Sequence, residues 1–302
     1  MNTIPLSKKS LANKTLYLLA IPVVVFYLIF NYIPMAGIIM AFQDFSPGAG
    51  IWGSDFVGLT HFANFLNSFF FGRIITNTMI LSLLSIAFEF TAPIVLALVL
   101  NEVSGRKFTG FVKFISCIPH FISLVVVCGI IHDFTGDGGV INQFATLFGY
   151  NGVPMLQQAE LFRPIYIVSG VWSSIGWGSI IYLGALTAID DTLYEAARID
   201  GARRWHQLWA VTIPGIMPTI IVMLLLRVAN IMNVSFDKIV LLYNPATFET
   251  SDVISTFVYR KGLQEFEFGY AAAVGLFNSV INLVLLLAAN RFSKKINNTG
   301  LW

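Results

Sequence analysis

The strongest constraint on this chain is a series of long apolar blocks, each of which is long enough to cross a lipid bilayer as a helix. A helical span of the hydrocarbon core takes about 20 apolar residues. Only 11% of the 302 residues are charged, against about 25% in soluble domains. We therefore predict an all-α membrane protein of about six transmembrane helices. The expected spans are residues 16–42, 74–100, 111–131, 164–188, 208–232 and 270–290.

Lysine and arginine are distributed unevenly among the segments that join these blocks. With the N-terminus inside, the inner segments hold Lys8, Lys9, Lys14, Arg106, Lys107, Lys113, Arg198, Arg203, Arg204, Arg291, Lys294 and Lys295. The outer segments hold only Arg73, Arg163, Lys238, Arg260 and Lys261. Because positive residues are retained on the cytoplasmic side, we predict an N-in, C-in topology. It gives a cytoplasmic segment 1–15, a transmembrane domain 16–290 and a cytoplasmic tail 291–302.

The inner stretch 190–207, DDTLYEAARIDGARRWHQ, is the most informative connection between two spans. It is polar and lacks proline, and its pattern predicts a short amphipathic helix, a turn at Gly201 and a second helical piece. Asp190 or Asp191 can cap the first piece. By its residues alone, such a helix is typical of one that lies on the inner leaflet. Its alanines would equally let another protein approach closely, and Gly201 permits a turn at little steric cost.

The stretch EAARIDGARRWHQLWAVTIPGIMP resembles the Glu-Ala-Ala (EAA) loop of ABC importer permeases. The positions that match this loop are Glu195, Ala196, Ala197, Asp200 and Gly201. The end of the motif departs from the family pattern, because Thr212-Ile213-Pro214 stands where Leu-Pro is usual. Other stretches resemble maltose-type sugar permeases, in the branch that serves polysaccharide fragments: NYIPMAGIIMAFQDF, FDKIVLLYNP and DVISTFVYRKGL.

The resemblance implies a type I ABC importer permease fold whose loop 190–207 is the cytoplasmic coupling helix. It implies a binding-protein-dependent importer in the bacterial cell membrane, in which this chain forms half of the translocation path for an oligosaccharide. The implied partners are a second permease subunit, two cytoplasmic ABC ATPase subunits, an extracellular sugar-binding protein and membrane lipid. ATP and Mg would be held by the ATPase subunits. Permeases for amino acids, peptides or anions share the same loop and stay as alternatives.

The sequence lacks the patterns of several other classes of protein. It contains no Gly-Lys pair and therefore no P-loop for nucleotide phosphates. Its 4 histidines are scattered and form no metal-binding motif, and no basic face interleaved with aromatics indicates nucleic-acid binding. A membrane-embedded enzyme would need a clustered acid, base or metal site, and a secondary transporter would show inverted repeats. We expect no catalytic residue, no metal site, no cofactor in this chain and no nucleic-acid partner.

Two charged residues lie inside predicted spans, Glu89 in the second and Arg227 toward the outer end of the fifth. Intramembrane charges are costly and usually face the protein interior or water. They either line a translocation path or make packing contacts, with Arg227 snorkelling outward. Aromatic side chains of the fourth block either stack on sugar faces or belong to the bundle core and interfacial belt. The candidate path residues are Glu89, Arg227, Asn230, Asn233, Asn278, Asn282, Trp172, Trp177 and Tyr182.

Overall fold

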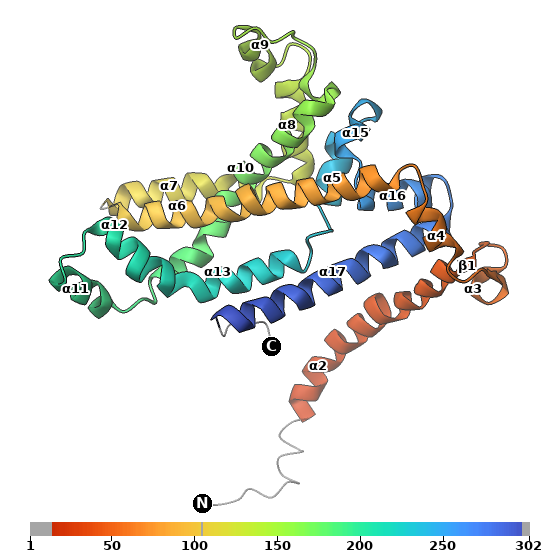
Figure 1. The fold of residues 1–302 in the computed structure, drawn as a ribbon, viewed down its shortest axis with the longest axis horizontal. Helices are drawn as coiled ribbons and strands as arrows, with labels where there is room; N and C mark the ends of the chain where they lie inside the picture. Colours follow the sequence, from red (N-terminus) through yellow and green to blue (C-terminus); the bar gives the residue numbers. More distant parts are fainter. Residues whose placement is uncertain (1–13, 104, 298–302) are drawn as a thin grey trace, which may run out of the picture. The chain divides into compact units, whose positions relative to one another are not determined.

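The computed structural model describes residues 14–103 and 105–297, which are predominantly helical (Figure 1). Within this part, 6 helical segments are long and apolar enough to cross a membrane. They are Tyr17–Phe42, Phe71–Glu102, Leu124–Thr146, Ala159–Leu186, Arg204–Val228 and Phe268–Lys295. The predicted all-α class and number of spans are confirmed. Most of the predicted cytoplasmic segment 1–15 and the end of the tail 291–302 lie outside the described residues.

The chain divides into two compact units, residues 1–66 with 261–276, and residues 67–260 with 277–302. Helix α17 (Phe268–Asn297) contributes to both. The first unit also holds helix α2 (Lys14–Tyr27), the π-helical turn η1 (Leu28–Tyr32), the 3-10 segment η2 (Ile33–Phe42), helices α3 (Gly50–Gly53) and α4 (Thr60–Leu66), most of the π-helical turn η8 (Arg260–Gln264), and strands β1 (Gln43–Asp44) and β2 (Asp55–Phe56). The two strands pair antiparallel.

The first unit packs the start of α17 against the short hairpin and α4. The rings of Phe65 and Tyr270 meet edge to face with centroids 6.4 Å apart, and His61 Nε2 lies 2.9 Å from the carbonyl oxygen of Gln43. A side chain at Gly269 would collide with that same carbonyl. In contrast, residues 17–27 of α2 are all exposed. Such an uncovered apolar helix fits a span that meets lipid or another membrane chain.

The second unit is a helical bundle built around α10, which contacts α6, α7, α13, α15, η3 and η4. Its elements are α5 (Phe71–Leu84), η3 (Ser85–Phe90), α6 (Thr91–Glu102), α7 (Arg106–Cys117), η4 (Ile118–Phe121), α8 (Leu124–Thr135), α9 (Val140–Thr146), η5 (Met155–Gln157), α10 (Ala159–Leu186), α11 (Asp191–Ile199), α12 (Arg204–Gln207), η6 (Leu208–Thr212), α13 (Ile213–Val228), α14 (Phe236–Leu242), η7 (Pro245–Thr247), α15 (Phe248–Ser251) and α16 (Ile254–Tyr259).

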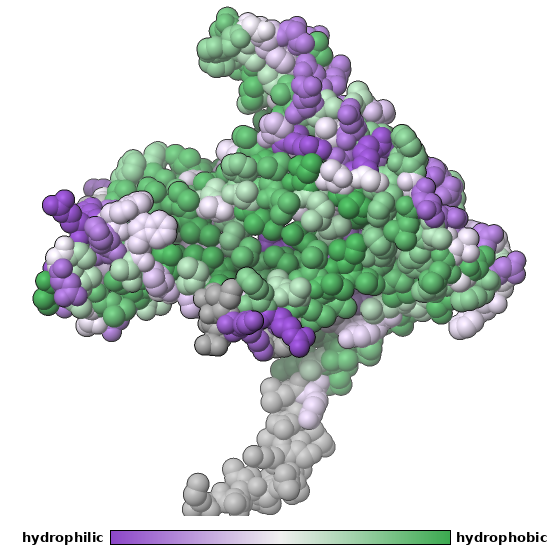
Figure 2. Space-filling model, in the orientation of Figure 1, coloured by the Kyte–Doolittle hydropathy of each residue, from purple (hydrophilic) through white to green (hydrophobic). Residues whose placement is uncertain are grey.

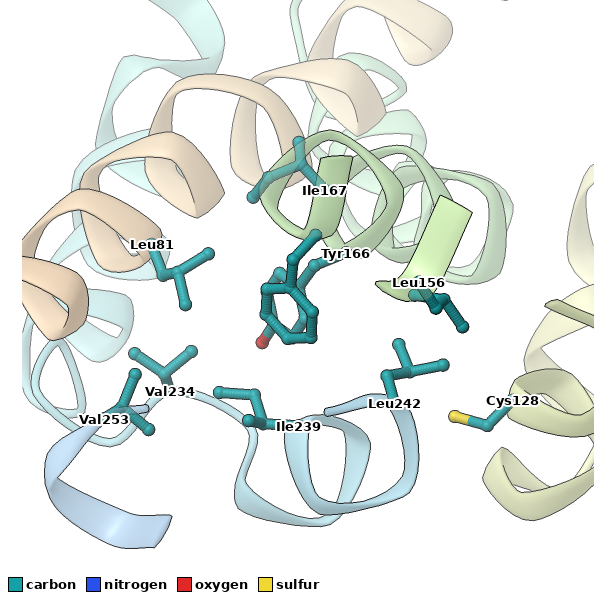
Figure 3. Packing of buried hydrophobic residues seen from close by; sticks show 10 residues of the cluster. Leu81, Cys128, Leu156, Tyr166, Ile167, Val234, Ile239, Leu242 and Val253 are labelled. Carbon is teal, nitrogen blue, oxygen red and sulfur yellow. The ribbon is translucent and has the colours of Figure 1, made fainter. Parts of the chain in front are cut away.

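Two clusters of buried side chains hold this bundle together. The larger one gathers around Tyr166 and Ile167 of α10, which meet Leu81 of α5 and Ile239 of α14 (Figure 3). The smaller one joins α6, α10 and α13 through Ala97, Tyr182, Leu186 and Ile216. Hydrophobic residues dominate the surface along α6, α10 and α13, whereas hydrophilic residues gather near α11, α12 and α15 (Figure 2). This distribution is typical of a bundle whose middle faces lipid and whose ends face water.

The predicted third span, residues 111–131, is not one helix. It divides into α7 and α8, which are separated by the 3-10 turn η4 and by Ile122 and Ser123 in extended conformations. Pro119 explains the break, because proline has no N–H group and its ring clashes with the carbonyl four residues earlier. The sequence-based expectation of a continuous helix here was wrong. The break has a structural consequence, since it brings His120 and Leu124 to the wall of the cavity described below.

Close approach between α7 and α10 depends on a small residue at position 176. An added Cβ at Gly176 would collide with the backbone carbonyl of Ser116, whereas an added Cβ at Gly184 of the same helix meets nothing within 4 Å. Small residues at helix contacts let backbones approach closely in membrane proteins. The two glycines of α10 are therefore a matched pair, one at a helix contact and one in open space.

We predict opposite effects for the same substitution at these two glycines. Gly176→Ala forces α7 and α10 apart and should lower the free energy of unfolding by about 1–3 kcal/mol, as overpacking does. Gly184→Ala should be neutral or stabilising, because alanine favours a helix over glycine by about 1 kcal/mol. Thermal unfolding of the two purified variants in detergent measures the difference. Equal melting temperatures would contradict the packing seen between α7 and α10.

Candidate functional site

A cavity of about 630 Å³ lies inside the second unit, among the membrane helices. Its walls come from α5, η3 and α6, from the break between α7 and α8, and from α10, α13 and α14. Many of the lining residues are polar, although the surrounding bundle is apolar. The polar residues are Ser82, Ser85, Glu89, His120, Tyr166, Ser173, Ser174, Trp177, Tyr182, Arg227, Asn230, Asn233, Ser235 and Lys238.

Glu89 and Arg227 form an ion pair on the cavity wall, with Arg227 Nη2 2.7 Å from Glu89 Oε2. Glu89 lies in the π-helical turn η3, an irregularity that frequently occurs at functional sites. Arg227 lies in the last turn of α13. The Glu89 side chain is 14% exposed and that of Arg227 is 45% exposed, so the arginine is the more open partner. The pair satisfies two charges that would be expensive to leave alone in a membrane.

Lys238 is a third charged residue on the cavity wall, and it is not among the path residues predicted from the sequence. It lies on α14, outside the six candidate spans, and is 5% exposed. Its amine donates to the carbonyl oxygen of Tyr166 at 2.6 Å and lies 4.3 Å from the centroid of the Tyr166 ring. Burial lowers the pKa of this amine to about 8. The signal in the sequence was the apolar run Ile239 to Leu242 directly after it, which is unusual for a solvated loop.

The fifth span ends earlier than predicted, at Val228 rather than at residue 232. The irregular chain that follows is held by side chains of neighbouring spans. Asn282 Oδ1 accepts a hydrogen bond from the Met232 amide at 2.9 Å, and the Ser82 hydroxyl donates to the carbonyl of Ile231. Non-helical backbone at membrane depth is tolerated only where it is buried in protein or lines a cavity. This unwound segment therefore belongs to the construction of the cavity.

The structure brings together six of the nine candidate path residues at the cavity. These are Glu89, Trp177, Tyr182, Arg227, Asn230 and Asn233. Asn278 supports the wall from behind, because its Nδ2 donates to Asn233 Oδ1 at 2.7 Å, and Asn282 supports it through Met232 as described above. Trp172 lies on α10 but is not among the lining residues. Within the described residues, no group of three or more His, Cys, Asp or Glu could hold a metal ion.

Trp177 is held in place by a ring from the break between α7 and α8. The His120 ring stacks on it with centroids 4.7 Å apart and planes 5° from parallel, and Phe121 meets it edge to face at 5.9 Å. One face of the indole is thus covered by a protein ring. Aromatic side chains present an apolar body with a polar edge, so Trp177 adds a flat apolar surface to a wall that also carries many polar groups.

A buried ionic network connects the outer connection 229–267 to the second and fourth spans. Asp252 is fully buried and accepts from Arg260 Nη2 at 2.7 Å and Nη1 at 3.2 Å. Arg73 Nη2 lies 3.5 Å from the same carboxylate. Asn77 donates to the carbonyl oxygen of Asp252 at 3.0 Å and accepts from Arg163 at 2.8 Å. This network leaves no local pattern in the sequence, because its members are far apart along the chain.

The inner loop 190–207 has the predicted helix, turn and helix order. Asp190 caps α11, because its Oδ1 accepts from the Thr192 amide at 2.9 Å, and this hydrogen bond lowers the pKa of the carboxyl. The helix ends in a Schellman motif. The amide of Gly201 bonds the carbonyl of Arg198 at 3.0 Å, and that of Ala202 bonds the carbonyl of Ala197 at 2.9 Å. Gly201 has a φ of +78°, a backbone region that side chains disfavour.

The matched loop residues occupy different positions on α11. Glu195 and Ala196 are exposed, Ala197 is half-buried and Asp200 is the C-cap residue that precedes Gly201. Tyr194 connects the loop to the following span, because its hydroxyl lies 3.0 Å from Thr212 Oγ1 of η6. No residue of α11 is buried. A helix of 9 residues with no buried residue is marginal by itself in water, and most residues of α11 are exposed.

Comparison with known proteins gives one consistent family. Residues 89–298 match the model described as binding-protein-dependent transport system inner membrane component. The chain is 41% identical over 295 residues to the polygalacturonan/rhamnogalacturonan transport system permease protein YteP of Bacillus subtilis (strain 168), with 97% of this chain and 92% of that protein covered. It is 39% identical over 291 residues to protein LplB of the same organism, with 96% and 92% covered.

A solved structure agrees with these relatives. The chain is similar to a chain in the crystal structure of a bacterial alginate ABC transporter in complex with alginate pentasaccharide-bound periplasmic protein. The two chains share 42% sequence identity and superpose with a TM-score of 0.89. The match covers 98% of this chain and 99% of the other.

The ionic network predicts that Asp252 contributes strongly to stability. Asp252→Asn leaves Arg260 and Arg73 without their shared carboxylate and should cost about 3–5 kcal/mol, as the loss of one partner from a buried pair does. Glu265→Gln is the control, because the pair of Lys261 with Glu265 is more exposed and should contribute about 1 kcal/mol or less. Thermal unfolding of both variants measures these effects. Equal and small decreases in the melting temperatures of the two variants would show that the buried Asp252 carboxylate does not anchor the outer connection.

Proposed function

Because this chain belongs to the family of binding-protein-dependent transport system inner membrane components, we propose that it is the permease subunit of an ATP-driven importer for an oligosaccharide. The observation that carries the proposal is the polar cavity among the membrane helices. Its volume of about 630 Å³ falls within the range of about 300–1,000 Å³ occupied by small-molecule sites. In this proposal the chain forms half of the translocation path in the bacterial inner membrane.

The chemistry of the cavity wall supports a sugar as the transported solute. Asn230, Asn233 and the serines of α5, η3 and α10 offer donors and acceptors for hydroxyl groups. Trp177 offers an apolar ring to the C–H face of a pyranose. The relatives support the same class, because they include a permease of a polygalacturonan/rhamnogalacturonan system and a chain of an alginate transporter. Asn278 and Asn282 are proposed to hold the wall rather than to contact the sugar.

The inner loop is proposed to couple this cavity to ATP hydrolysis by other subunits. Helix α11 exposes most of its surface, and Glu195 and Asp200 are acceptors for a basic surface of an ATPase. Ala196 and Ala197 let that surface approach closely. Beyond Gly201, α12, η6 and α13 continue as one helical span, Arg204–Val228. A displacement of α11 would therefore reach Arg227 at the cavity through a single helical segment.

The remaining parts of the importer are proposed as separate polypeptides. They are a second permease subunit, two cytoplasmic ATPases and an extracellular sugar-binding protein. ATP and Mg belong to the ATPases, since this chain has no P-loop sequence. The chain itself is proposed to have neither enzymatic activity nor a cofactor. Its exposed apolar residues, such as those of α2, would face lipid or the second permease.

The proposal predicts that uptake needs the whole assembly. Proteoliposomes that hold this chain with its second permease and ATPases should accumulate a labelled oligosaccharide only when ATP and the binding protein are supplied. The chain purified alone should hydrolyse no ATP. Robust ATP turnover by the isolated chain, free of contaminating ATPase, or uptake by the chain alone would refute the proposal.

A second prediction concerns the turn that ends α11. Gly201→Val places a β-branched side chain at a φ of +78°, which is strained for such residues, and should displace the docking surface. We expect normal membrane insertion, weaker co-purification of the ATPases and loss of uptake. Gly201→Asn is the matched control, because asparagine tolerates this backbone region, and it should retain most of the uptake.

Crosslinking provides an independent check of the same turn and helix. A cysteine at exposed Ala196 should crosslink to the ATPase in the assembled complex, whereas one at Ala246, on the predicted outer side, should not. Labelling of the cysteine at position 196 by an impermeant reagent from outside the cell would overturn both the topology and the coupling role.

A further inference from the structure

The charges on the cavity wall do not balance. Among the lining residues, Glu89 supplies one negative charge, whereas Arg227 and Lys238 each supply a positive charge. Glu89 is bonded to Arg227 at 2.7 Å. Lys238 uses its amine on a neutral backbone oxygen and on the face of an aromatic ring. The lining of the cavity therefore carries an excess of positive charge in a place where unbalanced charge is unfavourable.

Glu89 lies beside both cations rather than beside Arg227 alone. Gly170 on α10 lies next to both groups. An added Cβ there would collide with Glu89 Oε1 and would lie 3.1 Å from Lys238 Nζ. The carboxylate and the amine thus lie against the same glycine. A modest rotation of the Glu89 side chain would move its carboxylate from the guanidinium toward the amine. The missing side chain at Gly170 leaves the room for that rotation.

Arg227 is the cation that is open to a ligand. Its side chain is 45% exposed, against 14% for Glu89, and Lys238 is 5% exposed. A guanidinium binds a carboxylate through two parallel N–H···O bonds, which is a stronger and more directional contact than one to a hydroxyl. A ligand carboxylate bound to the Arg227 guanidinium would leave the Glu89 carboxylate free to pair with the Lys238 amine. The cavity would then hold two cations and two carboxylates.

We propose that Glu89 is a resident counter-ion that a substrate carboxylate replaces on Arg227, so that this cavity selects oligosaccharides made of uronic acids. The inference rests on the proposed function and deepens it by naming the substrate class. A neutral oligosaccharide cannot supply the missing negative charge. Glu89 also competes with the bound sugar for Arg227. This competition suits a transporter, because binding must be favourable enough for entry and weak enough for release.

The test compares two substrates that differ only in charge. One is a short oligogalacturonate, and the other is the same oligosaccharide after its carboxylates are reduced to hydroxymethyl groups. Equilibrium binding of each is measured on the purified permease–ATPase complex, so that the binding protein's own selectivity does not enter. The wild-type complex should bind the acid at least 10-fold more tightly than its reduced form. Uptake of both into proteoliposomes, with the binding protein present, is measured alongside.

The variants separate the role of each side chain. Arg227→Gln should lower affinity for the acid at least 10-fold and change affinity for the reduced form less than 3-fold, and Arg227→Lys should lie between. Glu89→Gln removes the competitor and should bind the acid several-fold more tightly than wild type, with slower turnover. The double variant Glu89→Gln/Arg227→Gln leaves no unpaired carboxylate at this position. It should stay folded and bind the acid and its reduced form with similar affinity. Lys294, which is exposed on α17, provides the control. Lys294→Gln should keep the wild-type ratio between the affinities for the acid and for its reduced form.

Failure of this inference and failure of the proposed function give different results. If the wild-type importer takes up neither oligosaccharide, the proposed function is wrong and the inference falls with it. If both are taken up and bind equally well to wild type, or if the double variant keeps the wild-type preference for the acid, the transporter assignment stands and the counter-ion role of Glu89 is wrong.

Discussion

The ion pair of Glu89 and Arg227 is the interaction on which the arrangement of the cavity depends. A single charge inside a membrane helix must find a partner or water, and these two residues come from helices that are far apart in the sequence. Their contact joins the π-helical turn of the second span to the end of α13. At 4 Å in a medium of intermediate polarity such a pair gains about 4 kcal/mol of Coulomb energy, which desolvation largely offsets. The pair therefore specifies the geometry of the site more than it stabilises the fold.

The same requirement explains the irregular backbone around the cavity. The third span breaks at Pro119, the second contains a π-helical turn and the fifth unwinds after Val228. Each irregularity exposes backbone groups that lipid cannot satisfy. After Val228, Asn282 and Ser82 supply hydrogen bonds to the unwound chain. The cavity and the breaks are thus one feature, because the breaks bring polar groups inward and the polar groups stabilise the breaks.

The sequence predicted most of the spans, the inner loop and six of the residues that line the cavity, because each of these leaves a local signal. Apolar length marked the spans, the EAA pattern marked the loop, and an unpaired intramembrane charge marked Glu89 and Arg227. What it missed depends on contacts between distant segments. In the sequence Lys238 looks like an ordinary outer lysine, and only the packing of α14 against Tyr166 of α10 shows that it is buried. The partners of Asp252 include Arg73 and Asn77 of α5, which lie more than 170 residues away along the chain, and Arg260. The break at Pro119 was not predicted, because apolar residues on both sides of it give the sequence pattern of one continuous span.

In the proposed function, the segment from α11 through Gly201 to Arg227 carries both the contact with the ATPase and the contact with the substrate. A structure of the assembled importer with an oligogalacturonate bound tests the counter-ion role of Glu89 most directly. We expect a substrate carboxylate on the Arg227 guanidinium, with the Glu89 carboxylate turned toward Lys238. A sugar bound in the cavity with the 2.7 Å contact between Arg227 and Glu89 intact would contradict it.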